Sequence, residues 1–125
     1  MWVITRIGFF NIIEQDDDKA KGVLTVKARS RKDLENFKKL NLLLQDRLTG
    51  GIEESNVTDY RFRLKGRKDS VIDALSKIVN SIDYGKTKPA IMKNFPERSG
   101  IYFQVWEDLY EIQRLDSAAK TQNPR

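Results

Sequence analysis

The chain opens with a largely apolar segment, Trp2–Ile13, in which a few polar residues are placed between the hydrophobic ones. The segment is too short to cross a bilayer, which takes about 20 apolar residues. Its β-branched and aromatic side chains favour a strand. Because the apolar residues do not alternate cleanly with polar ones, we expect a central strand that is covered on much of both faces.

Two later segments, Val23–Arg29 and Asp59–Lys65, alternate apolar and polar residues with a period of two. This period predicts a strand in each segment, with one apolar face and one basic face. The polar connection Glu14–Gly22 joins the first two strands and predicts a long hairpin. Its three consecutive aspartates lack the spacing of a calcium loop, so we interpret them as a solvated turn.

Apolar residues at helical spacing predict helices between and after these strands. The first should run from about Arg31 to Asp46, after a sequence that resembles a capping box. The second, from about Lys68 to Ile82, carries the strongest apolar stripe in the chain. The stripe consists of Val71, Ile72, Leu75, Ile78, Val79 and Ile82.

The C-terminal part of the chain predicts one more helix, followed by a polar tail. After Gly100, apolar residues again recur at helical spacing, and we expect this helix to dock through Trp106 and Leu109. The last residues, 116–125, are polar or small, and we expect a disordered tail. Residues 1–115 should then form a single domain.

This order of elements predicts an α+β fold. We expect a three- to four-stranded, mainly antiparallel sheet with two helices on one face, a ferredoxin-like (split βαβ) variant with an added C-terminal helix. Since a helix joins Val23–Arg29 to Asp59–Lys65, these two strands should be parallel, with a right-handed connection. The apolar first strand should lie between them.

The sheet face away from the helices is the candidate functional surface. Basic side chains of two strands should emerge there beside an aromatic group of the first strand. The candidate anion or nucleic-acid face comprises Lys27, Arg29, Arg61, Arg63, Lys65, Phe9 and Phe10. A bulge at Gly8 would switch the strand's parity, so the pattern leaves open which phenylalanine points to this face. We expect such a surface to be covered by the last helix, by a second copy of the chain or by a ligand.

The composition narrows the possible chemistry. The chain of 125 residues has no cysteine and no histidine, which excludes thiol nucleophiles, disulfides, histidine triads and histidine- or thiolate-bound metals. We recognise no catalytic constellation among the remaining residue types, so the sequence does not favour an enzyme, and we expect no cofactor. The net charge of +5 permits an anionic partner without requiring one.

Several short motifs, spread over nearly the whole chain, resemble those of a family of short, uncharacterised bacterial proteins. They are Met1-Trp2 with Gly8-Phe-Phe, Lys27–Glu35, Thr58–Arg61, Ile82–Tyr84 and Tyr102–Trp106. The resemblance implies a compact bacterial cytosolic domain and supplies no activity. The sequence departs from the family at Gly85–Lys88 and at Phe103-Gln104, where a histidine is missing, so a histidine-dependent role does not carry over.

Two functions from different classes are compatible with this sequence. The first is a small cytosolic binding or regulatory module that acts through protein contacts, either with a protein partner or as a homo-oligomer. The alternative is single-stranded nucleic-acid binding on the basic and aromatic sheet face. The chain shows no signal peptide and no run of 18 apolar residues, so we expect a cytoplasmic protein that does not enter the membrane.

Overall fold

The computed structural model describes residues 1–45, 51–83 and 85–122 and has the predicted α+β fold. Its contacts divide the chain into two compact units, Met1–Thr87 and Lys88–Arg125, although the sequence suggests one domain over residues 1–115. We describe each unit by itself.

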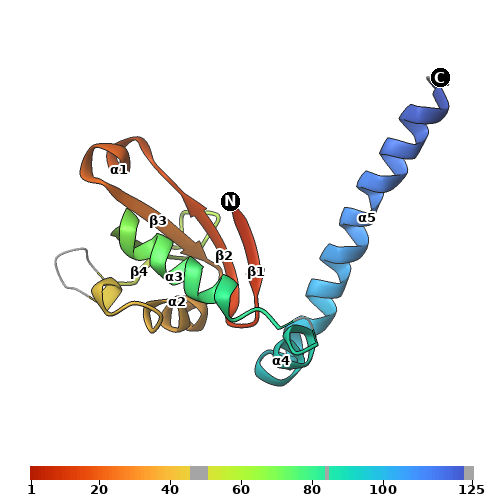
Figure 1. The fold of residues 1–125 in the computed structure, drawn as a ribbon. Helices are drawn as coiled ribbons and strands as arrows, with labels where there is room; N and C mark the ends of the chain where they lie inside the picture. The colour runs from red at the N-terminus through yellow and green to blue at the C-terminus, as the bar shows by residue number, and fades with distance from the viewer. Residues whose placement is uncertain (46–50, 84, 123–125) are drawn as a thin grey trace. The chain divides into compact units, whose positions relative to one another are not determined.

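The first unit is built on an antiparallel sheet, whose described part has five strands in the order β1-β2-β3-β5-β4 (Figure 1). The strands are β1 (Trp2–Thr5), β2 (Gly8–Ile13), β3 (Val23–Ala28), β4 (Glu53–Glu54) and β5 (Phe62–Arg67). The mainly antiparallel sheet of the sequence analysis is thus confirmed, with more strands than the three or four expected.

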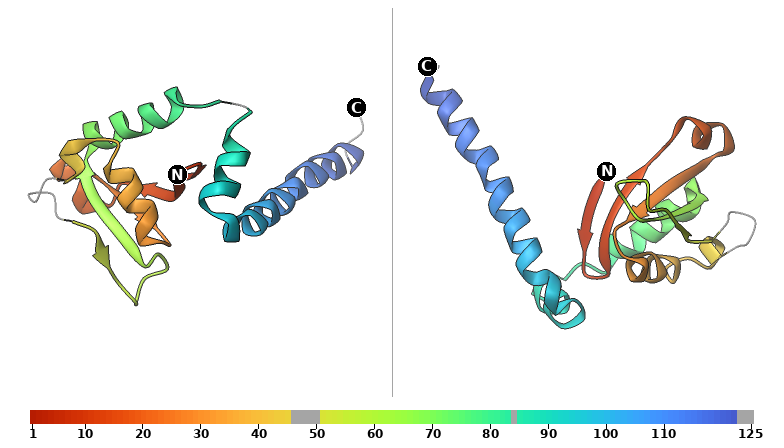
Figure 2. Two further views of the ribbon diagram at one scale, coloured as in Figure 1. Left: turned by 90° about the horizontal axis from the view of Figure 1, so that it is seen from below. Right: turned by 180° about the vertical axis from the view of Figure 1, so that it is seen from behind.

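Helices α2 (Arg31–Lys38) and α3 (Lys68–Asn80) lie on one face of the sheet, as Figure 2 shows. A 3-10 turn, η1 (Leu42–Gln45), follows α2, and a short helix, α1 (Asp16–Lys21), connects β2 to β3. The hydrophobic core lies between the sheet and these helices. Its buried residues are Phe10, Ile12, Val26, Ala28, Leu34, Phe37, Leu44, Leu64, Val71 and Ala74.

The segment Trp2–Ile13 is a hairpin and not the single central strand that its composition suggests. Of the two strands of this hairpin, β1 lies at the edge of the sheet and β2 lies between β1 and β3. The Thr5 side chain closes the turn, because its Oγ1 donates to the carbonyl oxygen of Gly8 (2.9 Å) and accepts from the N–H of Ile7 (3.2 Å). Gly8 has a φ of +154°, which side-chain-bearing residues rarely adopt.

The prediction that the second and third predicted strands are parallel is wrong, because β3 and β5 pair antiparallel. The predicted crossover requires one long helix, whereas α2 ends at Lys38 and Asp46 lies outside the described residues. The chain then turns through η1 and adds β4 on the outer side of β5. This detour reverses the direction in which β5 enters the sheet.

Helix α3 is confirmed, but only part of its apolar stripe is buried. Val71 is fully buried, and Leu75 and Ile78 are partly buried against the core. The small residues Ser70 and Ala74 are also buried, although they do not belong to the predicted stripe. The other members of the stripe, Ile72, Val79 and Ile82, are exposed by 52%, 61% and 68%.

The second unit consists of α4 (Thr87–Asn94), a 3-10 turn η3 (Pro96–Arg98) and the long helix α5 (Ser99–Gln122). Phe95 is buried, and the guanidinium of Arg98 lies 4.2 Å from its ring centre. Helix α5 continues to Gln122 through most of the expected disordered tail, which contains two alanines, the best helix formers. The end of that tail, residues 123–125, lies outside the described residues.

Candidate functional site

The sheet face opposite α2 and α3 carries a row of cross-strand neighbours, which we call the middle row. From β1 to β4 it consists of Trp2, Asn11, Lys27, Arg63 and Glu53. These residues alternate with core residues such as Phe10, Val26 and Leu64, so their side chains emerge on the face away from the core. The middle row therefore places Lys27 directly beside Arg63, on strands about 4.8 Å apart.

One end of this face is covered by α1, which is attached through Asp18. The buried carboxylate accepts hydrogen bonds from Thr25 Oγ1 (2.6 Å), the Gln15 N–H (3.0 Å) and Lys65 Nζ (2.5 Å). Burial raises the pKa of Asp18, but these three hydrogen bonds more than offset that effect and leave the pKa below its usual value. The interpretation of the three aspartates as a solvated turn is thus wrong for Asp18, and Lys65 is committed to an internal ion pair.

The other end of the face is covered by Tyr60, which is only 3% exposed. Its ring packs against Phe9, with the ring centres 6.3 Å apart, and Phe9 in turn meets Trp2 edge to face. The guanidinium of Arg29 lies 4.3 Å from the Tyr60 ring centre and donates to the carbonyl oxygen of Asp59 (2.7 Å). An aromatic cluster with its own cation therefore occupies this end.

The structure disperses the predicted basic and aromatic residues. Lys27, Arg63, Lys65 and Phe9 lie on the open face, whereas Phe10 lies in the core with its ring centre 5.1 Å from that of Phe37. Arg61 forms an ion pair with Glu54 (2.6 Å). Three of the five predicted cations, Arg29, Arg61 and Lys65, are thus engaged within the protein.

Lys27 and Arg63 are the two predicted cations without such partners. Neither forms an ion pair or hydrogen bond with another residue in the part of the chain that the structure describes. Nε and Nη2 of Arg63 are buried, although a buried donor without a partner typically costs about 1–3 kcal/mol. Strand alternation identified both residues, but only the tertiary contacts distinguish them from the engaged cations.

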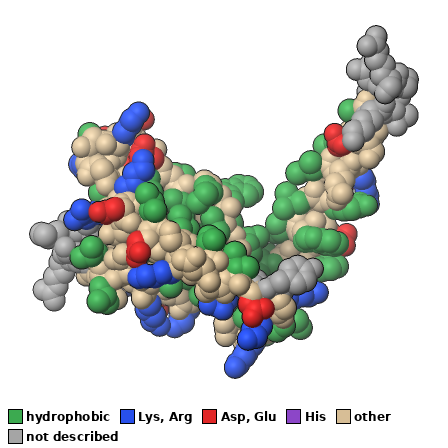
Figure 3. Space-filling model, viewed as in Figure 1, with side chains coloured by type: hydrophobic (Ala, Val, Ile, Leu, Met, Phe, Trp, Pro, Cys, Tyr) green, Lys and Arg blue, Asp and Glu red, His purple; other side chains and the backbone are tan. Residues whose placement is uncertain are grey.

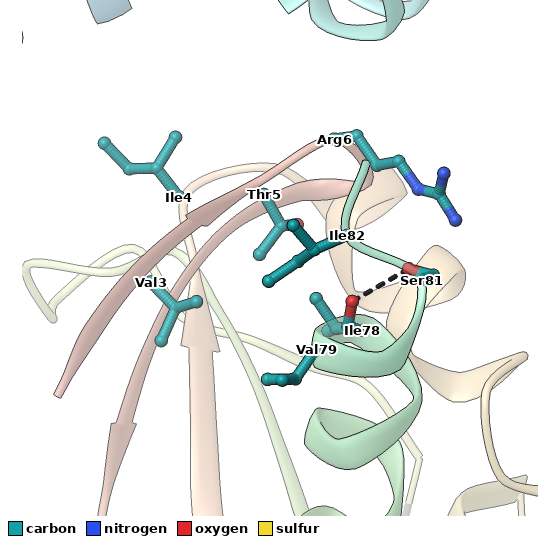
Figure 4. Close-up of a pocket in the computed structure, with 8 residues that line it drawn as sticks. All are labelled: Val3, Ile4, Thr5, Arg6, Ile78, Val79, Ser81 and Ile82. Atoms are coloured by element: carbon teal, nitrogen blue, oxygen red, sulfur yellow. Dashed lines mark hydrogen bonds between the residues drawn. The ribbon is translucent and has the colours of Figure 1, made fainter. Parts of the chain in front are cut away.

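An apolar hollow of about 280 Å³ lies between β1 and the C-terminal end of α3 (Figure 4). Its lining residues are Val3, Ile4, Thr5, Arg6, Ile78, Val79, Ser81 and Ile82. Apart from Arg6, whose side chain projects away in Figure 4, none of these residues is charged. The hollow suits an apolar side chain and has no evident chemistry. Sequence reasoning missed it because it requires β1 to be a separate edge strand.

Helix α5 carries the largest set of exposed apolar side chains among the described residues (Figure 3). The seven are between 47% and 70% exposed: Ile101, Phe103, Trp106, Leu109, Tyr110, Ile112 and Leu115. Trp106 and Leu109, through which we expect the helix to dock, are 62% and 55% exposed, and the docking of α5 stays a prediction. We call this set of seven residues the α5 apolar surface.

The described residues contain no group of three or more acidic side chains arranged to hold a metal ion. Over the same residues, no helix combines the length and the apolar character needed to span a bilayer. No family model, no curated protein and no solved structure matches the chain.

Proposed function

We propose that the protein is a binding module that acts through protein contacts and associates with further copies of itself through α5. The observation that carries this proposal is the α5 apolar surface, with seven large hydrophobic side chains on one helix. Large exposed apolar side chains gathered on one element favour an interaction site, because exposing them to water is unfavourable.

The spacing of apolar residues along α5 is that of a helix–helix seam. Tyr102, Val105, Leu109 and Ile112 are separated by three, four and three residues, the spacing of alternating a and d positions in a heptad. Tyr102 and Val105 are half-buried within the second unit, and the seam is more exposed at Leu109 and Ile112. At 1.5 Å per residue, a helix of 24 residues is about 36 Å long, which gives a second helix an extended surface.

A second copy fits the seam as the partner, because the same surface is present on every copy and two helices can pack their seam sides against each other about a twofold axis. At 3.6 residues per turn, the seven exposed residues are spread around more than half of the helix, so such a pair buries those on or beside the seam, such as Leu109 and Ile112.

The position of Asp116 favours an antiparallel pair of helices. Asp116 follows Ile112 by four residues and therefore takes the next a position of the seam. In a parallel pair, the two Asp116 carboxylates would face each other at the interface, where burial strengthens their repulsion. In an antiparallel pair, Asp116 lies toward the far end of the partner helix, away from its counterpart.

The test is the molar mass of the full chain in solution, measured by size-exclusion chromatography with light scattering. We expect a mass above the 14.5 kDa of one chain. Leu109→Asp and Ile112→Asp should each return it to 14.5 kDa, because burying an unpaired carboxylate in the seam is costly. Gln104→Asp is the matched control, since it adds the same charge at an exposed polar position. A wild-type chain that remains monomeric at high concentration would contradict the proposal.

The alternative, single-stranded nucleic-acid binding on the sheet face, has weaker support. Binding along a strand requires several cations that are free to contact phosphates. Arg29, Arg61 and Lys65 are engaged within the protein, and Phe10 lies in the core. We therefore prefer the function based on protein contacts.

A further inference from the structure

We propose that Lys27 and Arg63 hold the phosphate group of a small phosphorylated molecule on the open face of the sheet. This proposal concerns the first unit and is independent of self-association through α5. It rests on the contacts of the middle row and on what covers the face at either end.

In the absence of a ligand, Lys27 and Arg63 contribute little to the stability of the fold at these positions. Lys27 and Arg63 are directly opposed on neighbouring strands, and like charges in this arrangement repel each other. Both side chains are partly buried, which strengthens the repulsion relative to water. A bound anion would offset the repulsion between the two positive charges.

The acidic residues nearby do not neutralise this pair. Glu53 lies opposite Arg63 on β4, but the exposed Glu53 side chain forms no ion pair with it. The carboxylate of Asp18 is occupied by Lys65, Thr25 and the backbone of Gln15. The middle row thus keeps a local excess of positive charge at Lys27 and Arg63, between the two covered ends of the sheet face.

The charge of the two side chains favours phosphate. Nε and Nη2 of Arg63 are buried, and Nη1, which is not among the buried atoms, can donate a charge-assisted hydrogen bond to an oxygen of an anion on the open face. Lys27 supplies a second positive charge from the adjacent strand, which matches the charge of a phosphate monoester better than that of a carboxylate. Asn11, the next residue of the middle row, adds a neutral polar side chain.

The covered ends of the face favour a small molecule over a polymer. Helix α1 is fixed at one end through Asp18, and the cluster of Tyr60, Phe9 and Arg29 occupies the other. A nucleic-acid strand running along β3 and β5 would meet one of these obstacles after leaving the middle row. A single phosphate group needs only Lys27 and Arg63.

The first experiment is isothermal titration of the full chain at low ionic strength with inorganic phosphate, a nucleoside monophosphate and a short single-stranded oligonucleotide. We expect the first two to bind, and Arg63→Met and Lys27→Met each to weaken binding at least about tenfold, the loss of one charge-assisted hydrogen bond. Lys32→Met, at an exposed position on α2, is the control and should bind as the wild type does. Tighter binding of the monophosphate than of inorganic phosphate would identify an ester as the better ligand.

Three results would overturn the proposal: no binding of either phosphate probe, undiminished binding by both variants, or binding of the oligonucleotide alone. The last would indicate a surface for nucleic-acid strands instead. If Arg63→Met fails to fold, Lys27→Met decides the matter, because the Lys27 side chain has no hydrogen bond or ion pair to lose in the described structure.

A second measurement separates a binding arginine from a structural one. In phosphate-free buffer, Arg63→Met should raise the urea midpoint of unfolding, because it removes buried donors that have no partner. Added phosphate should raise the midpoint of the wild type and leave that of Arg63→Met unchanged. A lower midpoint for Arg63→Met without phosphate would mean that the guanidinium stabilises the fold itself, against the proposal.

Discussion

Replacing Asp18 with alanine is expected to destabilise the first unit by about 3 kcal/mol. The substitution removes a buried carboxylate that accepts three hydrogen bonds. It leaves the Thr25 hydroxyl without its acceptor and Lys65 with only its hydrogen bond to Gln15 Oε1 (3.1 Å). The Lys65 side chain is 36% exposed and can turn toward water, so the cost should lie at the lower end of the range for a broken buried ion pair. Urea unfolding followed by circular dichroism measures the change.

The neighbouring Asp17 is a suitable control, because it lies in the same turn of α1 but is exposed. Asp17→Ala should shift the free energy of unfolding by no more than about 0.5 kcal/mol, as for most surface substitutions. Equal stability of Asp17→Ala and Asp18→Ala would mean that α1 is not held to the sheet by this carboxylate.

The same carboxylate should make the protein sensitive to acid. The pKa of Asp18 is lower in the folded chain than its ordinary value of 3.8, so the unfolded chain takes up the proton first as the pH falls. The stability that Asp18 contributes is therefore fully present well above pH 3.8 and is lost as the pH falls through the folded pKa. Urea midpoints measured on the acid side of neutrality should fall more steeply for the wild type than for Asp18→Asn. Parallel curves for the two proteins would contradict this linkage.

Replacing Gly8 with alanine should also cost about 3 kcal/mol, for a steric reason. An added Cβ would lie 2.5 Å from Cγ and 2.7 Å from Cβ of Asp33, closer than such atoms can approach. The φ of +154° adds conformational strain for any residue with a side chain. Asp33 cannot easily move away, because its Oδ2 accepts the N–H of Phe9 (3.0 Å), which fixes α2 to the start of β2.

Gly51→Ala is the control for this substitution in the same unit. A Cβ at Gly51 would meet no atom within 4 Å, so alanine there should leave the midpoint of urea unfolding nearly unchanged. A Gly8→Ala protein as stable as Gly51→Ala would show that the β1–β2 turn and α2 can separate without cost.

The local periodicity of the sequence was enough to predict the α+β class and the position of several elements. The period of two in Val23–Arg29 and Asp59–Lys65 correctly separated the core residues Val26 and Leu64 from the charged side chains beside them. The helical spacing in the stripe of α3 correctly predicted that helix. Such patterns are reliable because they follow from how successive side chains point along one element.

Other features depended on contacts between residues far apart in the sequence. The apolar run Trp2–Ile13 contains no conventional turn signal, and it becomes a hairpin because Gly8 packs against Asp33 and leaves β1 at the edge. That turn also fixes the parity of β2, which places Phe10 in the core and Phe9 outside.

In the candidate site, too, some features could be predicted from the sequence and others depended on the tertiary structure. Alternation placed Lys27, Arg63 and Lys65 on one face, but it could not show that Asp18 binds Lys65, since these two residues lie 47 positions apart. Nor could it give the direction of β5, which depends on the path of the chain through η1 and β4. The sequence by itself determined which face each strand residue occupies, because the pleat is a local property. Only the tertiary structure decided which strands pair and which charges are left without partners, because those depend on contacts across the whole unit.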